Sequence, residues 1–395
     1  MSYEAPFAGL KVVDLSQGIA APYAGMLLAQ YGAEVIKVEV MGGGDWVRAS
    51  APEPGGNTAL SIMGNLGKRS IALDLKSPEG CAALWRLIEG ADVFMEGFRP
   101  GVIKRLGFSY EAVSAKNPRI LYLAMSGFGQ SGPLAERPAM DPVLQAFTGF
   151  MMENREADGT PKNVISIPVD LISALYVFQA LSAALYARRD EQRGRYVEAS
   201  LMHGAAWLNT YAMLQSFIHG GAPPPPRPPN NVFRTADGWL HVVVAGHRGW
   251  AEFCAAIDRP ELANDSRFDT TGARQQNADL VVSICSEILA TRPTAHWIAR
   301  FTEQRVMHAV VNSSMDFLRE PHVEATGLFS YLAQPGLTDP VPIPALPGAP
   351  RPESGSRRGT APLAGADTAA ILAEHGYSEA EIAALTERRI AGRAD

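Results

Sequence analysis

The stretch KVVDLSQGIAAPYAGMLLAQYGAEVIKVE, residues 11–39, decides the class of fold. It begins with the apolar run Lys11–Leu15, which is typical of a short buried strand, and it ends with a similar run at Glu34–Glu39. Between them, Pro22–Gln30 predicts a helix, because proline is well tolerated in the first turn. A strand, a helix and a strand in this order predict a β-α-β unit with parallel strands and a right-handed crossover.

The same alternation continues beyond this unit, after the glycine loop Met41–Asp45. We expect further strands at 70–75, 91–95, 120–125 and 195–200. We expect helices at 78–90, 100–106 and 201–217, a helix that begins at 141, and a long apolar helix that begins near 168. Strands that alternate with helices indicate an α/β fold, in which a parallel sheet carries helices on both faces.

The composition changes at residues 220–231, GGAPPPPRPPNN, where the prolines predict a stiff and extended linker. Beyond it, two strands at 232–234 and 239–244 flank the hairpin signal TADG, and helices are expected near 249–257, 276–289 and 293–302. These elements predict a second, smaller α+β domain. The tail 334–363 is rich in proline and glycine and is expected to run extended over the surface, before two short helices at 367–374 and 378–388.

The overall composition is that of a globular protein, with 395 residues, 47% hydrophobic and 19% charged. The net charge of −6 gives no indication of nucleic-acid binding. Three scattered cysteines fit a reducing compartment and show no metal-binding spacing, so we expect a cytoplasmic protein without a metal. The N-terminus lacks the features of a signal peptide. The apolar run Leu171–Ala187 is shorter than the roughly 20 residues that span a bilayer and is interpreted as buried core, so no membrane is expected.

That apolar run belongs to the segment ISIPVDLISALYVFQALSAALYARR, residues 165–189, which places a lone carboxylate, Asp170, at its head. Aspartate is a preferred residue at a helix N-cap, so one interpretation is that Asp170 only caps the helix. The other is that Asp170 is a positioned carboxylate whose ionised form the helix N-terminus favours. This segment alone leaves both interpretations open.

Several familiar motifs fail on their context. The run Gly127–Gly132 has the spacing G-x-G-x-x-G, but Pro133 follows where a dinucleotide site needs a helix. No G-x-S-x-G elbow or zinc-binding histidine pattern occurs. A cluster of basic residues remains, which either gathers at one sheet edge to bind phosphate or forms solvated surface charge. Its members are Lys37, Lys68, Arg69, Lys76, Arg99, Lys104 and Arg105.

Five segments together resemble the family III CoA-transferases, the carnitine- and formyl-CoA transferase group, also called the CaiB/BaiF family. They are FAGLKVVDLSQGIAAPYAGMLLAQYGAEVIKVE, NLGKRSIALDLKSPEG, ADVFMEGFRPGVIKRLGFSYE, NPRILYLAMSGFGQSGP and the terminal APLAGADTAAILAEHGYSEAEIAAL. The likeness runs over essentially the whole chain, in order and with matching gaps.

The resemblance implies a Rossmann-like large domain built from both chain ends, a small domain from the middle, and two ring-like subunits interlocked as a homodimer. Accordingly we expect residues 1–220 and 325–395 to build the large domain and its return linker. Residues 221–231 are then the proline-rich linker and residues 232–324 the small domain. The partners implied are acyl-CoA, a small carboxylic acid and a second copy of the chain. Coenzyme A enters as part of a substrate, and no permanently bound cofactor is expected.

The resemblance also assigns residues. Asp170 stands where the family has its nucleophile, which passes through an acyl-aspartyl anhydride and an aspartyl-CoA thioester. The residues that correspond to CoA contacts are Ile19, Ala20, Leu73, Asp74, Leu75, Lys76, Gly97, Phe98, Arg99, Arg105, Arg137, Pro138, Ala139 and Met140. Among these, Lys76, Arg99, Arg105 and Arg137 are the expected phosphate partners. Two departures from the family pattern are Val40 in place of a basic residue and Gly97 in place of asparagine.

Two alternative functions are weighed against transfer. The related α-methylacyl-CoA racemases use a His/Asp pair, and Met140 stands at the position of that histidine, which disfavours proton exchange. A non-catalytic acyl-CoA-binding protein would keep the basic cluster and would not need Asp170. The sequence does not identify the donor or the acceptor. A glycine-rich flap in relatives corresponds to 224–231, which is proline-rich here. The aromatic residues Trp46, Phe147 and Phe150 either shape the acceptor pocket or belong to the core.

Overall fold

The computed structural model describes residues 5–52, 55–156, 158–221 and 228–393, and it divides the chain into two compact units. The large unit comprises Met1–Met213 and Gly327–Asp395, and the small unit comprises Leu214–Thr326. Most of the expected proline-rich linker, residues 222–227, lies outside the described residues.

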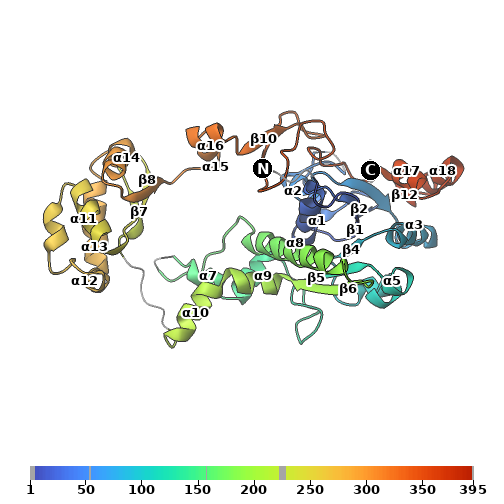
Figure 1. The fold of residues 1–395 in the computed structure, drawn as a ribbon, viewed down its shortest axis with the longest axis horizontal. Helices are drawn as coiled ribbons and strands as arrows, with labels where there is room; N and C mark the ends of the chain where they lie inside the picture. The colour runs from blue at the N-terminus through green and yellow to red at the C-terminus, as the bar shows by residue number, and fades with distance from the viewer. Residues whose placement is uncertain (1–4, 53–54, 157, 222–227, 394–395) are drawn as a thin grey trace. The chain divides into compact units, whose positions relative to one another are not determined.

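The large unit is organised around a seven-stranded sheet with the strand order β12-β3-β2-β1-β4-β5-β6 (Figure 1). The strands are β1 (Lys11–Asp14), β2 (Glu34–Val40), β3 (Arg69–Leu73), β4 (Val93–Glu96), β5 (Leu121–Ser126), β6 (Arg195–Ser200) and β12 (Ala391–Gly392). All neighbouring pairs are parallel except β12 with β3, which is antiparallel. The predicted α/β fold with a parallel sheet is therefore confirmed, and β12 is an additional strand at one edge.

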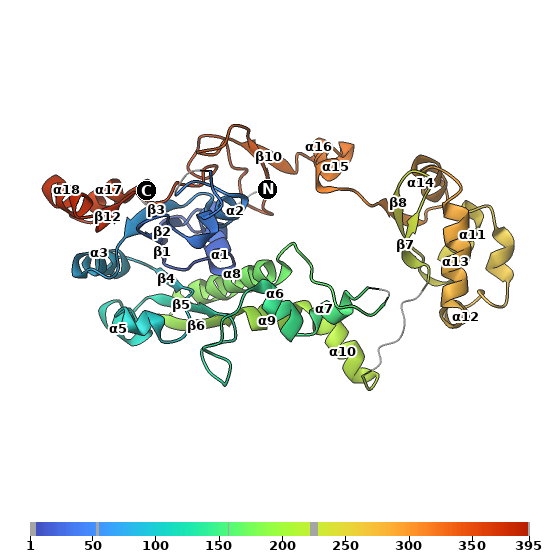
Figure 2. The same ribbon diagram turned by 180° about the vertical axis from the view of Figure 1, so that it is seen from behind.

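Helices cover both faces of this sheet, and successive strand residues point to opposite sides. Val12 belongs to one buried cluster together with α1, α8 and α9, whereas Val13 belongs to a second cluster with α3, α5, α17 and α18. The helices α1 and α8 lie side by side in both views (Figures 1 and 2). The helices of the large unit are α1 (Ala20–Gln30), α2 (Ala59–Asn65), α3 (Pro78–Glu89), α4 (Val102–Arg105), α5 (Tyr110–Lys116), α6 (Asp141–Phe147), α7 (Phe150–Glu153), α8 (Pro168–Arg188), α9 (Leu201–Leu208), α17 (Thr368–Glu374) and α18 (Glu379–Glu387), with a 3-10 turn η1 at Trp46–Arg48.

The predicted single helix over 201–217 is wrong, because the chain forms two helices here, α9 and α10 (Thr210–Ile218). The break falls at Asn209, which is buried and whose side-chain amide donates to the carbonyl oxygen of Thr148 at 2.9 Å. A tertiary hydrogen bond of this kind is invisible to a pattern of apolar residues along one helix.

The tail 334–363 is not wholly extended. β10 (Phe329–Leu332) and β11 (Val341–Pro344) form an antiparallel hairpin in which Pro342 and Pro344 lie opposite Tyr331 and Phe329. Prolines are tolerated in β11 because it is an edge strand. The apolar helix α8 is partly buried, and among the described residues it alone is long and apolar enough to cross a membrane, a test that core helices also pass.

The small unit is built on an antiparallel sheet of β7 (Asn230–Arg234), β8 (Trp239–Val243) and β9 (Met307–Val310). Its helices are α11 (Gly246–Ala256), α12 (Thr271–Gln276), α13 (Ala278–Leu289), α14 (Thr294–Glu303), α15 (Ser314–Leu318) and α16 (Pro321–Thr326), with a 3-10 turn η2 at Pro260–Asn264. Phe233 and Leu240 from the sheet pack with Trp250 and Phe301 from the helices in a separate core.

Candidate active site

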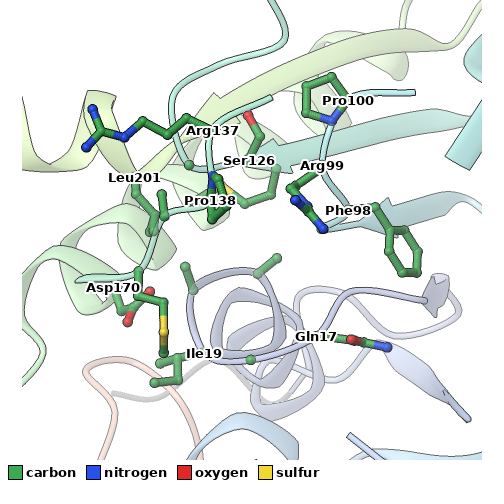
Figure 3. Close-up of a pocket in the computed structure, with 18 of the residues that line it drawn as sticks. Gln17, Ile19, Phe98, Arg99, Pro100, Ser126, Arg137, Pro138, Asp170 and Leu201 are labelled. Atoms are coloured by element: carbon green, nitrogen blue, oxygen red, sulfur yellow. The ribbon is translucent and has the colours of Figure 1, made fainter. Parts of the chain in front are cut away.

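A cavity of about 490 Å³ opens at the carboxyl ends of β1, β4 and β5 (Figure 3). In open α/β sheets, ligands bind outside these ends, where the strand order changes direction, and here that change lies between β1 and β4. The wall is formed by residues 17–21 after β1, 97–100 after β4 and 125–127 around the end of β5, together with residues 135 and 137–140, Trp46, Asp170 and Leu201.

Many of the predicted contact residues meet in this cavity. Those that line it are Ile19, Ala20, Gly97, Phe98, Arg99, Arg137, Pro138, Ala139, Met140 and Asp170. The remaining predicted contacts, Leu73, Asp74, Leu75, Lys76 and Arg105, are not among its lining residues as the structure describes it. Leu73 is buried in β3, whereas Lys76 and Arg105 are exposed.

Arg99 and Arg137 both line the cavity, and their side chains point in different directions. Arg99 directs its guanidinium toward the middle of the cavity, on the side of Phe98 and Gln17 (Figure 3). Arg137 directs its guanidinium away from Arg99, and this group lies 5.8 Å from the ring centre of Phe128. Asp170 lines the same cavity, and so do the apolar residues Ile19 and Leu201.

Asp170 is not the N-cap of its helix, so that prediction is wrong. Helix α8 begins at Pro168, and the N-cap is Ile167, which has the left-handed conformation φ 49°, ψ 48°. A branched residue at positive φ stores backbone strain on the order of 1–3 kcal/mol. This turn places Asp170 third in the helix, with 9% of the residue exposed, at the wall of the cavity.

The capping carboxylate of α8 is Asp141, the first residue of α6. One oxygen, Oδ2, accepts hydrogen bonds from the backbone N–H groups of Val169 at 2.7 Å and Asp170 at 3.0 Å. The other, Oδ1, accepts from the side chain of Gln145 at 2.5 Å, and Gln145 also holds both backbone polar groups of Val164 at 2.8 Å. The segment leading into α8 is therefore fixed from α6.

The arrangement changes the expected ionisation of Asp170. Burial and the charge of Asp141 raise the pKa of Asp170 from 3.8 to about 7. The expectation that the helix N-terminus simply favours the charged form is overturned, because Asp141 already occupies the N–H groups of Val169 and Asp170. A carboxylate that is dehydrated and repelled by a neighbour is more basic than one in water.

The predicted basic cluster does not gather at the cavity. Lys37 and Lys68 are completely buried and form ion pairs with Asp45 at 3.0 Å and with Asp14 at 2.6 Å. Arg69 binds Glu374 and Glu34. These three residues are thus neither phosphate ligands nor solvated surface charge, whereas Lys76, Lys104 and Arg105 are exposed and Arg99 lines the cavity.

Sequence reasoning missed several wall residues, namely Gln17, Gly18, Met125, Ser126 and Leu201. For Gly18 the sequence did contain a signal, because a glycine follows the first strand. In the structure its φ is 81°, a value that glycine adopts without strain. Trp46, left open between the pocket and the core, lines the cavity and is 47% exposed. Burial raises the pKa of Glu96, directly before Gly97, to about 7, and Glu96 accepts a hydrogen bond from the backbone N–H of Phe98 at 2.8 Å.

Known proteins resemble this chain over most of its length. Residues 7–368 match CoA-transferase family III. An acetyl-CoA:oxalate CoA-transferase from Acetobacter aceti is 35% identical over 300 residues, which are 74% of this chain and 77% of that protein. A human succinyl-CoA:glutarate CoA-transferase is 30% identical over 93% of this chain and 86% of its own length.

The structural comparison agrees with the sequence comparison. A crystal structure of a CaiB/BaiF family protein from Brucella suis superposes with a TM-score of 0.83 and 27% identity, covering 94% of this chain and 100% of that one. The resemblance recognised from the five sequence segments is confirmed by both. The chain belongs to CoA-transferase family III and is an enzyme that transfers coenzyme A.

Proposed function

We propose that the enzyme moves CoA from an acyl-CoA donor to a free carboxylic acid through covalent intermediates on Asp170. The observation that carries this proposal is a carboxylate with a pKa of about 7 in the wall of the large cavity at the carboxyl ends of the parallel strands. A basic, poorly hydrated carboxylate is suited to act as a nucleophile. The order of the covalent steps is taken from the resemblance to the family.

The first half-reaction transfers the acyl group and then CoA to the enzyme. A carboxylate oxygen of Asp170 attacks the thioester carbonyl, the C–S bond breaks, and an acyl-aspartyl anhydride and CoA thiolate result. The thiolate then attacks the aspartyl carbonyl, which releases the donor carboxylate and leaves an aspartyl-CoA thioester. The acceptor carboxylate attacks this thioester, which breaks the C–S bond, expels CoA thiolate and forms a second anhydride between the acceptor and Asp170. The thiolate then attacks the acceptor carbonyl of this anhydride, and cleavage of the C–O bond to the aspartyl oxygen gives the acceptor acyl-CoA and free Asp170. No net proton or water is consumed.

The electrostatics around Asp170 favour acylation in this scheme. The ionised carboxylate is repelled by Asp141, and both the anhydride and the thioester remove the charge from Asp170. The repulsion and the poor hydration therefore raise the free energy of the resting carboxylate relative to the covalent states. The same arrangement leaves the N–H groups of Val169 and Asp170 occupied, so the oxyanion formed during attack must be stabilised by other groups.

The cavity offers separate places for the two ends of acyl-CoA. We infer that Arg99 binds the phosphate-bearing end, because its guanidinium points into the cavity beside Phe98, and that the thioester lies at the apolar end beside Asp170. The relatives named above act on oxalate and glutarate, and a Chloroflexus relative on L-malate, so we infer that the acceptor is a small dicarboxylic acid.

A second copy of the chain is the further partner that we propose. Helices α9 and α10 expose large apolar side chains, with Trp207 61%, Tyr211 76% and Phe217 87% exposed. Exposed apolar patches of this kind are typical of interfaces. This is consistent with the homodimer that the resemblance implies.

Proton exchange at the acyl α-carbon receives less support than transfer. The racemase histidine is replaced by Met140, which lines the cavity and whose thioether does not exchange protons near neutral pH. The described residues that line the cavity include no histidine.

The experiment that tests the proposal is a transfer assay with acetyl-CoA or succinyl-CoA as the donor and oxalate, malate or glutarate as the acceptor. We expect a new acyl-CoA with the native enzyme and none with Asp170→Asn, while binding of CoA to the variant persists. Transfer by Asp170→Asn would refute the assigned nucleophile. Deuterium uptake at the α-carbon in heavy water, without transfer, would support the racemase instead.

A further inference from the structure

The wall of the cavity between β1 and α1 rests on buried charges. The backbone N–H of Ser16 donates to Asp14 Oδ1 at 3.0 Å, and the Ser16 hydroxyl donates to the same oxygen. The Ser16 carbonyl accepts from Lys37 Nζ. The backbone N–H of Gly18 donates to both carboxylate oxygens of Asp45 at 3.1 Å. The turn that carries Gln17 and Gly18 into the cavity is therefore held by the side chains of Asp14, Lys37 and Asp45.

These charges are paired with one another and closed to solvent. Lys37 and Asp45 lie 3.0 Å apart with side chains 0% and 1% exposed, and the pair of Lys68 with Asp14 is fully buried at 2.6 Å. The carboxylate of Glu39 accepts from the backbone N–H of Asp45 at 2.9 Å. Buried ion pairs are poor sources of stability, because apolar residues of similar volume often stabilise a protein as well or better. Their value here lies in the fixed positions that they impose on the turn.

Asp45 joins two parts of the cavity wall. It caps the 3-10 turn Trp46–Arg48, accepting from the Val47 N–H at 3.4 Å, and it directly precedes Trp46. The Trp46 ring lies over Gly18, where a Cβ atom would come within 3.0 Å of it. Gly18 and Trp46 both line the cavity, whereas Asp45 does not. One buried carboxylate thus sets the position of the turn and of the aromatic ring together.

We infer that the Lys37–Asp45 pair is a positioning pair for acyl-CoA binding, which keeps the Gln17–Gly18 turn and the Trp46 ring in the conformation that receives the substrate. This inference rests on the proposed function, in that acyl-CoA occupies this cavity. The nucleophile is held independently, because Asp170 is fixed by Asp141 from α6. Loss of the pair therefore weakens substrate binding and leaves the chemical step largely intact.

The test uses Asp45→Asn and the double variant Lys37→Gln/Asp45→Asn in the full-length enzyme. The single variant leaves Lys37 without its ion pair to Asp45. The double variant removes both charges of the pair, and its CoA affinity can still be measured if the single variant does not fold. The dissociation constant of CoA is measured by calorimetry, and kcat and KM are measured in the transfer assay. We expect the dissociation constant and the KM for acyl-CoA to rise about tenfold, with kcat changed by less than about threefold.

A matched control is Asp92→Asn, which removes the ion pair of Asp92 with Arg188 at 2.7 Å. Asp92 directly precedes β4 and lies at the opposite end of that strand from the cavity, so we expect an unchanged KM. We expect a smaller loss of stability than in Asp45→Asn, because the Asp92 side chain is 30% exposed. Unchanged CoA affinity in a folded double variant would overturn the inference, and so would an equal rise in KM with Asp92→Asn. Failure of the native enzyme to bind CoA would overturn the proposed function and this inference together. CoA binding without transfer by the native enzyme would contradict the proposed function alone.

Discussion

At the scale of single residues, the two aspartates at the start of α8 have opposite roles. Asp141 carries out the capping that the sequence suggested for Asp170, because it accepts from two N–H groups of the first turn. Asp170 is thereby left with a high pKa in an apolar wall. The family position of Asp170 in the sequence led us to expect it as the reactive carboxylate, whereas the identity of the capping residue depends on a contact between α6 and α8.

The pH dependence of transfer should report the pKa of Asp170. Because the ionised form attacks, kcat/KM is expected to rise with pH through about 7, where burial and Asp141 place the pKa. Asp141→Asn removes a negative charge and should move this rise of kcat/KM, the acidic limb of the pH–rate profile, to lower pH. Gln145→Leu is the control, since it breaks the hydrogen bonds around Asp141 but keeps its charge, and it should leave the limb in place. A limb that stays unchanged in Asp141→Asn would contradict the assignment.

Ionisation of Asp170 should lower the free energy of unfolding, although it raises the activity. The folded pKa of about 7 lies above the ordinary value of 3.8, so between these values the folded state binds more protons than the unfolded state, and stability falls as pH rises. Asp170→Asn should therefore be more stable than the native enzyme at pH 8, by up to about 4 kcal/mol, and similar to it near pH 4. Urea unfolding at both pH values measures this. A variant that is less stable at pH 8 would show that the carboxylate is well accommodated.

At the scale of elements, the sequence predicted the strands of the parallel sheet, but it did not predict the features that depend on tertiary contacts. The run at β5 is apolar on both faces, which is the pattern of strands buried between two helical layers. β1 and β2 are also largely buried, but they carry the charged residues Asp14, Lys37 and Glu39. The break at Asn209 and the edge strand β12 depend on partners that are distant in sequence. The same holds for Lys37 and Lys68, whose buried partners became apparent only in the fold.

The packing of α8 against α9 gives a prediction at this scale. A Cβ atom on Gly204 of α9 would lie 2.0 Å from Oγ of Ser173, one turn beyond Asp170 in α8. Gly204→Ala should therefore push the first turns of α8 away, destabilise the enzyme by about 1–3 kcal/mol and lower kcat. Gly90→Ala is the matched control, because a Cβ atom there meets nothing within 4 Å. Equal stability and turnover for the two variants would show that the helices can separate without consequence.

At the scale of the whole molecule, the proposed homodimer predicts the behaviour of the exposed apolar residues. Phe217→Glu places a charge on α10, where the native side chain is 87% exposed, and should weaken association of two copies. Sedimentation velocity at micromolar concentration should give a dimer for the native enzyme and a smaller species for the variant. A native monomer that is fully active would contradict the proposed dimer, and Arg248→Glu on the exposed surface of α11 is the control.

The central claim is that Asp170 becomes covalently acylated and then carries CoA. Its most direct test is mass spectrometry of the enzyme after incubation with succinyl-CoA or acetyl-CoA and trapping with hydroxylamine or borohydride. The account predicts an aspartyl hydroxamate, or the alcohol formed by reduction, on the peptide that contains Asp170 and on no peptide of Asp170→Asn. An unmodified Asp170 peptide from an enzyme that transfers CoA in the same sample would contradict it.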